Sequence, residues 1–326
     1  QFLSVVGGEP LLTQTYKRLQ KFINKKNIFI IADGKYLRNV RECLPGFSNA
    51  NFISEPAPRN TAPALIQANI FLSRINPQAN LLVVPADHFI PNEQIFARQM
   101  TAALDYTQNR YVITAGIKPS EPHTGYGYIQ FAEKKAAKIN CGDFHDVIQF
   151  KEKPDRKTAL HYIKKGNYFW NSGMFVYKLA YFKEFFKQYA PYYYQQYEAL
   201  EQVGKNNVNF AKVYKAIRPE SIDYALMEKL KETVMFKADF SWNDVGSWSS
   251  VYEMNKKDKQ KNVCRGRIIA IDTKNSLLFS DQSKPLAVIG LDQVAVINTA
   301  NGILVTPISQ LQQVKQVIQI LITDKK

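Results

Sequence analysis

The stretch Leu81-Leu82-Val83-Val84-Pro85-Ala86-Asp87-His88 decides the fold class of this 326-residue chain. Four consecutive apolar residues are typical of a strand that is buried on both faces, as the strands of parallel sheets are. The strand ends on a carboxylate, and an unpaired charge at the end of a buried strand is expensive. Asp87 therefore predicts either a ligand of a divalent cation or a cap for the next helix.

Strands and helices alternate on both sides of this stretch. Short apolar strands are expected at 27–32 and 111–115, and helices with broad apolar faces at 61–75 and 95–104. This order predicts an α/β domain over residues 1–258, with a mixed, mostly parallel sheet and right-handed crossovers. Ligands of such sheets bind beyond the carboxyl ends of the strands, so motifs that follow strands are the candidates for function.

The pattern changes after Lys259. Short strands separated by turn residues replace the longer helices, which predicts a small β-helix-like domain at 259–326 with a helix at 311–320. The predicted strands of this domain span 267–271, 276–279, 286–289, 294–297 and 303–305.

The composition excludes several classes of protein. No apolar run approaches the roughly 18–20 residues of a membrane span. Cys43, Cys141 and Cys264 are far apart and form no zinc-binding pattern with the four histidines, which favours a reducing cytoplasm. The net charge of +15 is spread along the chain. We therefore expect no nucleic-acid or membrane partner, and a basic field that attracts phosphate groups.

A second carboxylate lies in the segment Ser241-Trp242-Asn243-Asp244-Val245-Gly246-Ser247-Trp248. Two tryptophans and a glycine beside this aspartate indicate a rigid wall rather than a flexible loop. Asp87 and Asp244 are candidates to share one Mg²⁺, because carboxylate oxygens suit that ion. Spacing along the chain does not by itself bring the two side chains together.

Two polar segments have the chemistry that a sugar phosphate requires. In Phe150-Lys151-Glu152-Lys153-Pro154, the carboxylate of Glu152 suits sugar hydroxyls and Lys153 offers a compact positive charge for a phosphate. In Trp170-Asn171-Ser172-Gly173-Met174-Phe175, the amide of Asn171 both donates and accepts hydrogen bonds. The alternatives are a charged turn closed by proline and a simple turn.

Two further segments place small or polar residues where a ligand could approach the backbone. Gly125 and Tyr126 lie in His123-Thr124-Gly125-Tyr126-Gly127-Tyr128-Ile129, which is also compatible with the start of a hairpin. Asn60 or Thr61 is expected to cap the helix that follows, and the same free N–H groups suit an anion or a base edge. Arg59 beside them is either a ligand residue or an ordinary surface charge.

Taken in order, these segments resemble the bacterial mannose-1-phosphate guanylyltransferase family, the GDP-mannose pyrophosphorylases. No segment alone is specific, but the collinear set covers nearly the whole chain. It comprises Gln1-Phe2-Leu3, Glu55-Pro56-Ala57-Pro58-Arg59-Asn60-Thr61-Ala62-Pro63, Pro85-Ala86-Asp87-His88, Gly116-Ile117, Thr124 to Ile129, Phe150 to Pro154, Asn171 to Phe175, Ser221-Ile222-Asp223-Tyr224-Ala225-Leu226-Met227-Glu228 and Trp242 to Trp248.

The resemblance implies a glycosyltransferase-A-like nucleotidyltransferase domain followed by a short β-helix-like domain. It implies the reaction of GTP with α-D-mannose 1-phosphate to give GDP-mannose and pyrophosphate, with Mg²⁺ held by Asp87 and Asp244. By the same resemblance, Glu152 and Asn171 bind mannose together with the backbone around Gly125 and Tyr126. Lys153 holds the sugar phosphate as a catalytic cation, Arg59, Asn60 and Thr61 line the guanine pocket, and Asp223 is mainly structural.

The family also begins with a Gly-rich phosphate-binding loop, G-G-x-G-x-R-L-x-P, which the resemblance places before Gln1. Gly7-Gly8 is expected to be a turn before the first helix and not that loop. Three alternatives remain open at this point. They are a nucleotidyltransferase with another sugar phosphate or base, a sugar-nucleotide sensor without catalysis, and a basic nucleic-acid-binding protein. The β-rich tail is a candidate contact for a homodimer.

Overall fold

The computed structural model describes residues 1–109, 111–139, 142–204 and 208–323. These residues divide into two compact units. The larger unit comprises residues 15–86 and 90–242, and the smaller unit comprises residues 1–14, 87–89 and 243–326. No helix among the described residues is long and apolar enough to cross a membrane.

The larger unit contains strands and helices in alternation, and α1 (Leu11–Gln20) begins in the smaller unit and ends in the larger one. Its strands are β1 (Ile30–Asp33), β2 (Phe52–Glu55), β3 (Asn80–Val83), β4 (Val112–Ile117), β5 (Tyr128–Ile139), β6 (Gly142–Lys151), β7 (Tyr168–Lys178) and β8 (Thr233–Lys237). Its α-helices after α1 are α2 (Leu37–Cys43), α3 (Thr61–Ser73), α4 (Glu93–Tyr106), α5 (Arg156–Lys165), α6 (Leu179–Tyr189), α7 (Pro191–Val203) and α8 (Val208–Ala216). Short helical turns are η1 (Lys25–Asn27), η2 (Gly34–Tyr36), η3 (Asn49–Asn51), η4 (Thr107–Asn109) and the π-turn η5 (Asp223–Met227).

The central sheet of the larger unit has the order β3-β7-β4-β8-β6-β5. Strands β3, β4, β5 and β8 run in one direction, and β6 and β7 run in the other. The expected mixed sheet is confirmed, but the expectation that it is mostly parallel is wrong for the described ladders. Each reversed strand separates neighbours that run the same way, so β4–β8 is the one parallel pair in this described sheet.

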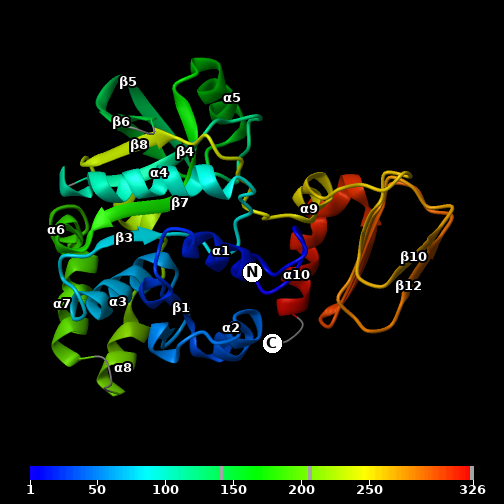
Figure 1. The fold of residues 1–326 in the computed structure, drawn as a ribbon, viewed down its shortest axis with the longest axis horizontal. Helices are drawn as coiled ribbons and strands as arrows, with labels where there is room; N and C mark the ends of the chain where they lie inside the picture. Colours follow the sequence, from blue (N-terminus) through cyan, green and yellow to red (C-terminus); the bar gives the residue numbers. More distant parts are fainter. Residues whose placement is uncertain (110, 140–141, 205–207, 324–326) are drawn as a thin grey trace. The chain divides into compact units, whose positions relative to one another are not determined.

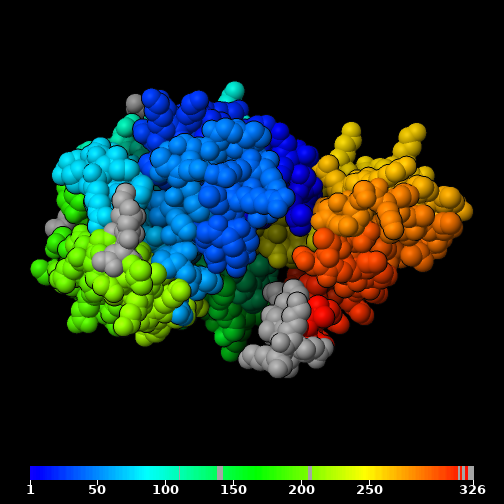
Figure 2. Space-filling model, turned by 90° about the horizontal axis from the view of Figure 1, so that it is seen from below, coloured from blue at the N-terminus to red at the C-terminus, as the bar shows by residue number. Residues whose placement is uncertain are grey.

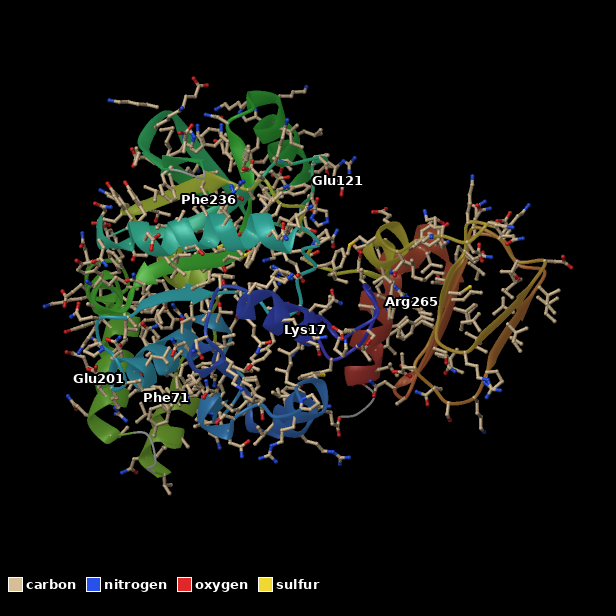
Figure 3. The ribbon with its side chains drawn as sticks, in the orientation of Figure 1. Lys17, Phe71, Glu121, Glu201, Phe236 and Arg265 are labelled. Atoms are coloured by element: carbon tan, nitrogen blue, oxygen red, sulfur yellow. The ribbon has the colours of Figure 1, made fainter. Side chains whose placement is uncertain are left out.

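This sheet is buried on both faces, because its strands carry apolar side chains on each. Along β7, Phe175 and Tyr177 belong to one core, whereas Met174 and Val176 belong to the other. Helices α3, α6, α7 and α8 cover the first face, and α4 and α5 cover the second, with α4 lying along the strands (Figure 1). Figure 3 shows Phe236 of β8 among the strands and Glu201 of α7 at the surface.

The strand expected at 81–84 is present as β3 (Asn80–Val83), but it is half-buried, so the expectation of burial on both faces is wrong there. The strand expected at 27–32 is present as β1, and it too is half-buried along its whole length. The physical reason is its pairing: β1 forms a two-stranded parallel sheet with β2, in the register Ile30↔Phe52 to Asp33↔Glu55. No other strand among the described residues pairs with it. Figure 2 shows the N-terminal part of the chain, coloured blue, over a broad area of the face in view.

The smaller unit is rich in short strands, as the sequence predicts. Its elements are α9 (Trp248–Met254), β9 (Val263–Arg265), β10 (Ile268–Ile271), β11 (Leu277–Ser280), β12 (Leu286–Ile289), β13 (Val294–Thr299), β14 (Gly302–Pro307), η6 (Ile308–Gln313) and α10 (Val314–Thr323). Strand β11 pairs in parallel with β9 and β13, and β10 pairs in parallel with β12, so alternate strands stack in two layers (Figure 1). This coil encloses a core that includes Leu278, Val288 and Val296. Leu277 and Phe279, on the other face of β11, belong to a separate core with Val251 of α9.

Candidate active site

The two carboxylates expected to bind a metal, Asp87 and Asp244, both belong to the smaller unit. An antiparallel bridge holds the two segments side by side. Phe89 N–H donates to Asn243 O at 2.9 Å, and Asn243 N–H donates to Phe89 O at 3.1 Å. Asp87 lies two residues before one end of this bridge and Asp244 follows the other. The fold thus brings together the backbone of two segments that are about 150 residues apart in the chain.

A tight turn fixes the side chain of Asp244. Its Oδ1 accepts the N–H of Gly246 at 3.1 Å, and Asn243 Oδ1 accepts the N–H of Val245 at 2.7 Å. Val245 has a left-handed backbone, with φ of 51°. A Cβ added to Gly246 would lie 2.7 Å from Oδ2 of Asp244, so glycine leaves room for the carboxylate.

The donor chemistry of these two residues fits Mg²⁺. Among the described residues there is no group of three or more His, Cys, Asp or Glu side chains arranged for a metal. Mg²⁺ in nucleotide enzymes, however, is commonly held by one or two carboxylates, with the other ligands supplied by water and phosphate. Asp87 and Asp244, two half-buried aspartates on adjoining segments, carry the donor atoms that such a site uses.

In the larger unit, Glu152 and Lys153 follow directly after β6. Glu152 is buried, with its side chain 8% exposed, whereas the side chain of Lys153 is 55% exposed. The Lys153 ammonium pairs with Oε1 of Glu152. Burial lowers the pKa of Lys153, but the hydrogen bond and the negative charge of Glu152 outweigh it, so the pKa is raised overall. The lysine is therefore a firmly protonated, partly exposed cation.

Asn171 of β7 has its amide orientation fixed by the protein. Its Oδ1 accepts the N–H of Gly173 at 3.1 Å and the hydroxyl of Thr114 at 3.4 Å. Because a backbone N–H only donates, the amide oxygen must face Gly173 and the amide nitrogen must face away. The β4–β7 ladder shifts register between Thr114 and Gly116, opposite Asn171, as bulges near functional sites commonly do. Asn171 therefore directs its amide nitrogen, a donor, away from Gly173.

Gly127 is a residue of this cluster that sequence reasoning missed. Its carbonyl accepts the N–H of Asn171 at 2.8 Å. A Cβ added to Gly127 would overlap Oε2 of Glu152 and would lie 3.4 Å from Cβ of Asn171. The absence of a side chain at this position therefore makes room for the Glu152 carboxylate. The glycine pair 125 and 127 was visible in the sequence, but only the fold distinguishes their roles.

The π-turn η5 brings two more carboxylates to the cluster. At its start, Asp223 Oδ1 accepts Nδ2–H of Asn171 at 3.0 Å. At its end, Glu228 Oε1 accepts the backbone N–H of Glu152 at 3.0 Å. The wide turn, closed by Glu228 N–H donating to Asp223 O at 2.9 Å, presents both side chains to the same cluster. The sequence motif was visible, but its place beside Asn171 and Glu152 was not.

Asp223 has an altered acidity in this setting. Burial and the negative charge of Glu152 together raise the pKa of Asp223 to about 6, against the opposing effects of its backbone hydrogen bond, Lys153 and Asn171. A carboxyl group that titrates near neutral pH beside a cluster of hydrogen-bond donors and acceptors is characteristic of functional sites.

Gly125 and Tyr126 lie beside an aromatic group rather than beside the Glu152 carboxylate. The ring of Tyr126 stacks on His123 at 3.9 Å and meets Trp170 and Trp242 edge-on at 5.0 and 5.2 Å. Gly125 N–H donates to Nδ1 of His123 at 3.2 Å. These rings form a rigid wall in the larger unit, and Trp170 immediately precedes Asn171 in β7.

The segment from Glu55 to Arg59, which leads into the residues expected to line the guanine pocket, is hydrogen-bonded to the last turn of α8. Tyr214 donates to Oε1 of Glu55 at 2.6 Å, and burial raises the pKa of Glu55. The Arg59 guanidinium donates to the carbonyl of Lys215 in the last turn of α8. Arg59 is thereby used at least in part to hold the loop in place.

The end of the same segment is hydrogen-bonded to a residue next to the polar cluster of Glu152, Lys153 and Asn171. Asn60 caps α3, as predicted, by accepting the N–H of Thr61 at 2.8 Å, and its φ of 67° is left-handed. Thr61 Oγ1 accepts the N–H of Ile222 at 2.8 Å, immediately before Asp223. The loop at 59–61 and the cluster around Asn171 are therefore joined through the adjacent residues Ile222 and Asp223.

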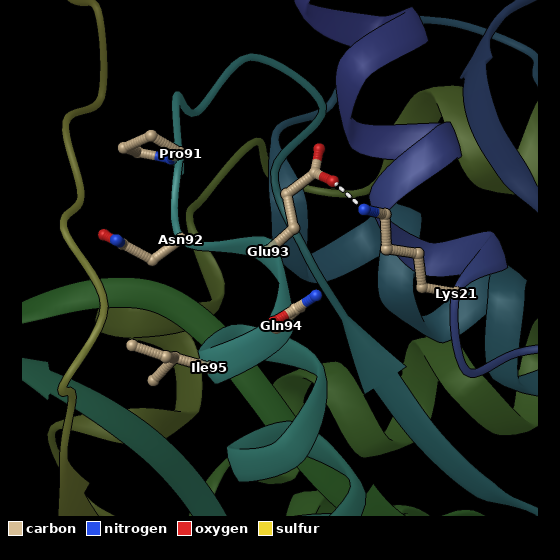
Figure 4. Close-up of a pocket in the computed structure, with 6 residues that line it drawn as sticks. All are labelled: Lys21, Pro91, Asn92, Glu93, Gln94 and Ile95. Carbon is tan, nitrogen blue, oxygen red and sulfur yellow. Dashed lines mark ion pairs between the residues drawn. The ribbon is translucent and has the colours of Figure 1, made fainter.

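A pocket of about 340 Å³ lies at the start of α4, lined by Lys21, Pro91, Asn92, Glu93, Gln94 and Ile95 (Figure 4). Lys21 and Glu93 form an ion pair of 2.5 Å across it. None of the predicted site residues lines this pocket. The candidate site is defined instead by the polar cluster of Glu152, Lys153 and Asn171.

The chain matches two family models in sequence. Residues 1–261 match the nucleotidyl transferase family, and residues 266–321 match the MannoseP isomerase/GMP-like beta-helix domain. The chain is 35% identical to mannose-1-phosphate guanylyltransferase 2 of Escherichia coli O157:H7, over 98% of this chain and 68% of that protein. The chain belongs to the mannose-1-phosphate guanylyltransferase family of nucleotidyltransferases.

Other relatives agree with this family. The chain is 35% identical to the xanthan biosynthesis protein XanB of Xanthomonas campestris pv. campestris (strain B100), over 98% of this chain and 67% of that protein. Its fold matches a crystal structure from Thermus thermophilus, titled a mannose-1-phosphate geranyltransferase, with a TM-score of 0.83 and 27% identity. That match covers 96% of this chain and 90% of the other. Membership of the family makes the chain a nucleotidyltransferase and confirms the resemblance seen in the sequence.

Proposed function

We propose that this protein transfers GMP from GTP to α-D-mannose 1-phosphate and releases pyrophosphate. The observation that carries the proposal is the cluster of a buried acceptor, Glu152, an oriented donor, Asn171, and a partly exposed cation, Lys153. This set suits a polyol that carries a phosphate. The names of the relatives, mannose-1-phosphate guanylyltransferases, support GTP and mannose 1-phosphate as the substrates.

The proposed roles follow from the contacts of each side chain. Glu152 accepts hydrogen bonds from sugar hydroxyls, and Asn171 donates one from its remaining amide N–H. Lys153 offers its ammonium to the sugar phosphate, and Arg59, Asn60, Thr61 and the wall at Gly125 and Tyr126 complete the binding of guanine and sugar. An oxygen of the sugar phosphate then attacks the α-phosphorus of GTP, the bond to the β-phosphate oxygen breaks, and pyrophosphate leaves. No covalent intermediate with the protein is required, so catalysis rests on positioning and charge.

Asp87 and Asp244 would hold the Mg²⁺ ion of this reaction. When bound, Mg²⁺ neutralises charge on the phosphate oxygens. The two aspartates supply hard oxygen ligands, and the turn at Val245 and Gly246 keeps the Asp244 carboxylate oriented.

Pyrophosphate release measured over a panel of nucleoside triphosphates and hexose 1-phosphates tests the proposal. GTP with mannose 1-phosphate is expected to have the highest kcat/KM. A different best pair would replace the substrate assignment, and binding of GDP-mannose without any turnover would favour a sugar-nucleotide sensor.

We further propose a homodimer, a boundary between two domains near residue 258, and a cytoplasmic location. Exposed isoleucines at 269, 271 and 289 on β10 and β12 support a contact between copies. Cys43 and Cys264 form no disulfide among the described residues, which supports a reducing compartment, whereas Cys141 lies outside those residues. Sedimentation equilibrium tests the dimer, and a monomer at micromolar concentration would refute it.

A further inference from the structure

Two carboxylates of the polar cluster, Glu152 and Asp223, interact with the ammonium group of Lys153. Glu152 pairs with Lys153, and Asp223 is close enough to Glu152 for its negative charge to act on Asp223. Two adjacent carboxylates do not both remain ionised easily unless a cation compensates them. The protonation of Asp223 therefore depends on where the Lys153 ammonium lies.

Lys153 is the member of the cluster that is able to move. Its side chain is 55% exposed, whereas the side chain of Glu152 is 8% exposed. The backbone N–H of Glu152 is also held by the carboxylate of Glu228. Lysine has a flexible four-carbon stem and a compact charge. A phosphate dianion that arrives beside Glu152 competes for this ammonium with more negative charge than the carboxylate carries.

The surroundings of Asp223 contain little else that responds to pH. Glu152 and Lys153 are the charged side chains of other segments that act on its titration. Helix α3, packed against η5, has no titratable side chain. Helix α6, also packed against η5, carries Tyr181, Lys183, Glu184, Lys187 and Tyr189, and Lys183 pairs with Glu198 and Glu201.

The two polar neighbours of Asp223 are also accounted for. Asn171 is neutral, and Glu228, at the end of the same turn, is engaged by the N–H of Glu152. Tyr224, the next residue in the turn, is exposed.

We propose that Asp223 takes up a proton from solvent when the sugar 1-phosphate binds, because the phosphate draws the Lys153 ammonium away from Glu152. The chemical change is the conversion of the Asp223 carboxylate to a carboxyl group, with Glu152 left ionised to accept the sugar hydroxyls. This inference rests on the proposed function, since it needs a sugar phosphate at Lys153. Asp223 is then a positioning residue that adjusts the charge of the cluster to its ligand.

The proposal has a definite pH signature. A ligand whose binding takes up a proton binds more tightly as the pH falls toward the pKa of the free group. Asp223 in the free protein titrates with a pKa of about 6, so the affinity for mannose 1-phosphate should increase between about pH 8 and pH 6.5. Below this range the ligand itself loses its second negative charge, because phosphate monoesters have a second pKa of about 6.

Isothermal titration calorimetry of the full chain with mannose 1-phosphate at pH 7, in two buffers of different ionisation enthalpy, measures the proton uptake directly. The wild-type protein should take up a substantial fraction of one proton. Asp223→Asn should lose most of this uptake, and the exposed Asp105→Asn should retain it. Infrared difference spectra of the wild type provide a measurement that needs no variant, since a protonated carboxyl band should appear on binding.

The outcomes separate this inference from the proposed function. Binding without proton uptake, or equal uptake in Asp223→Asn and wild type, would overturn the role of Asp223 and leave the substrate assignment intact. Absence of any binding of mannose 1-phosphate would overturn the proposed function and this inference together.

Discussion

Gly127 is the residue on which the position of the Glu152 carboxylate depends most directly. A methyl group in Gly127→Ala would overlap Oε2 of Glu152, while the backbone at 127 has no left-handed strain. We expect the variant to fold and to lose between about 10- and 100-fold in kcat/KM for mannose 1-phosphate, because small displacements of a positioning group have effects of this size. Steady-state kinetics with saturating GTP measure it.

Gly125→Ala is the matched comparison for this variant. Its added methyl group would meet only the ring of His123, which is partly exposed and able to shift. The loss should therefore be clearly smaller than at 127. Equal losses at the two positions would show that the overlap with Glu152 is not what matters.

Asp223 should also affect stability in a way that depends on pH. Its pKa is raised to about 6 in the folded protein, so the folded state binds more protons than the unfolded state between about pH 4 and pH 6. Stability from this group is present below the ordinary aspartate pKa and is lost as the pH rises through the folded pKa. The free energy of unfolding of Asp223→Asn, relative to that of the wild type, should therefore increase by roughly 1–3 kcal/mol between pH 4 and pH 7.

Thermal melts of both proteins across this pH range measure the effect. The difference in melting temperature between variant and wild type should increase with pH. A difference that stays constant, or that favours the wild type more at pH 7, would contradict the assignment of the shifted pKa to Asp223.

At the residue scale, the sequence was sufficient to nominate Glu152, Lys153 and Asn171, because their chemistry is legible from residue type. It was not sufficient to include Gly127, Asp223 or Glu228. The contributions of these three arise from contacts across 25 or more residues of chain, with Asn171 or Glu152 as the partner. Residue type alone does not reveal such contacts.

The bridge between the segments at 87–89 and 243 is the element on which the proposed metal site depends. Asp87→Asn and Asp244→Asn each replace a hard anionic ligand with a neutral amide of the same shape. Each variant should lose at least about 100-fold in kcat, since charge neutralisation by a metal contributes several kcal/mol to such reactions. Pyrophosphate release against Mg²⁺ concentration measures the loss.

Asp281→Asn, an exposed aspartate in the same unit, is the control for charge removal and should remain active. Circular dichroism establishes whether each variant is folded. Activity of Asp87→Asn or Asp244→Asn within a few fold of wild type would remove that residue from the metal site.

The hydrogen bond from Ile222 N–H to Thr61 Oγ1 connects the start of α3 with the segment that leads into η5. Thr61→Val removes the acceptor while keeping the shape of the side chain. We expect a loss of about 1 kcal/mol in the free energy of unfolding, as for a single hydrogen bond. Thr61→Ser keeps the hydroxyl and should restore most of it; denaturant unfolding of the two variants provides the comparison.

For the whole molecule, the coil of the smaller unit requires close approach between successive turns. Gly266 has φ of 94°, and a Cβ there would overlap the backbone carbonyl of Ser280. Gly290 has a similar left-handed φ of 70° but open space around it. Gly290→Ala should lower the free energy of unfolding by about 1–2 kcal/mol, from backbone strain alone. Gly266→Ala should cost about 1–3 kcal/mol more.

Thermal unfolding followed by circular dichroism compares the two glycine variants. If both lose the same stability, the approach of the Gly266 and Ser280 backbones is not tight. Normal stability of both would also exclude the left-handed strain at these positions.

The sequence by itself determined the α/β class, the order of most strands and helices, the change to short strands after residue 259, and the family. These are properties of local patterning and of ordered motifs, which depend on residues near one another in the chain. Only the tertiary structure decided that the reversed strands β6 and β7 separate strands of like direction, and that β1 is half-buried. It alone placed Asp223 against Asn171 and Glu228 against Glu152. Strand pairing and side-chain contacts between distant segments depend on how the whole chain packs, and local patterning carries little information about that.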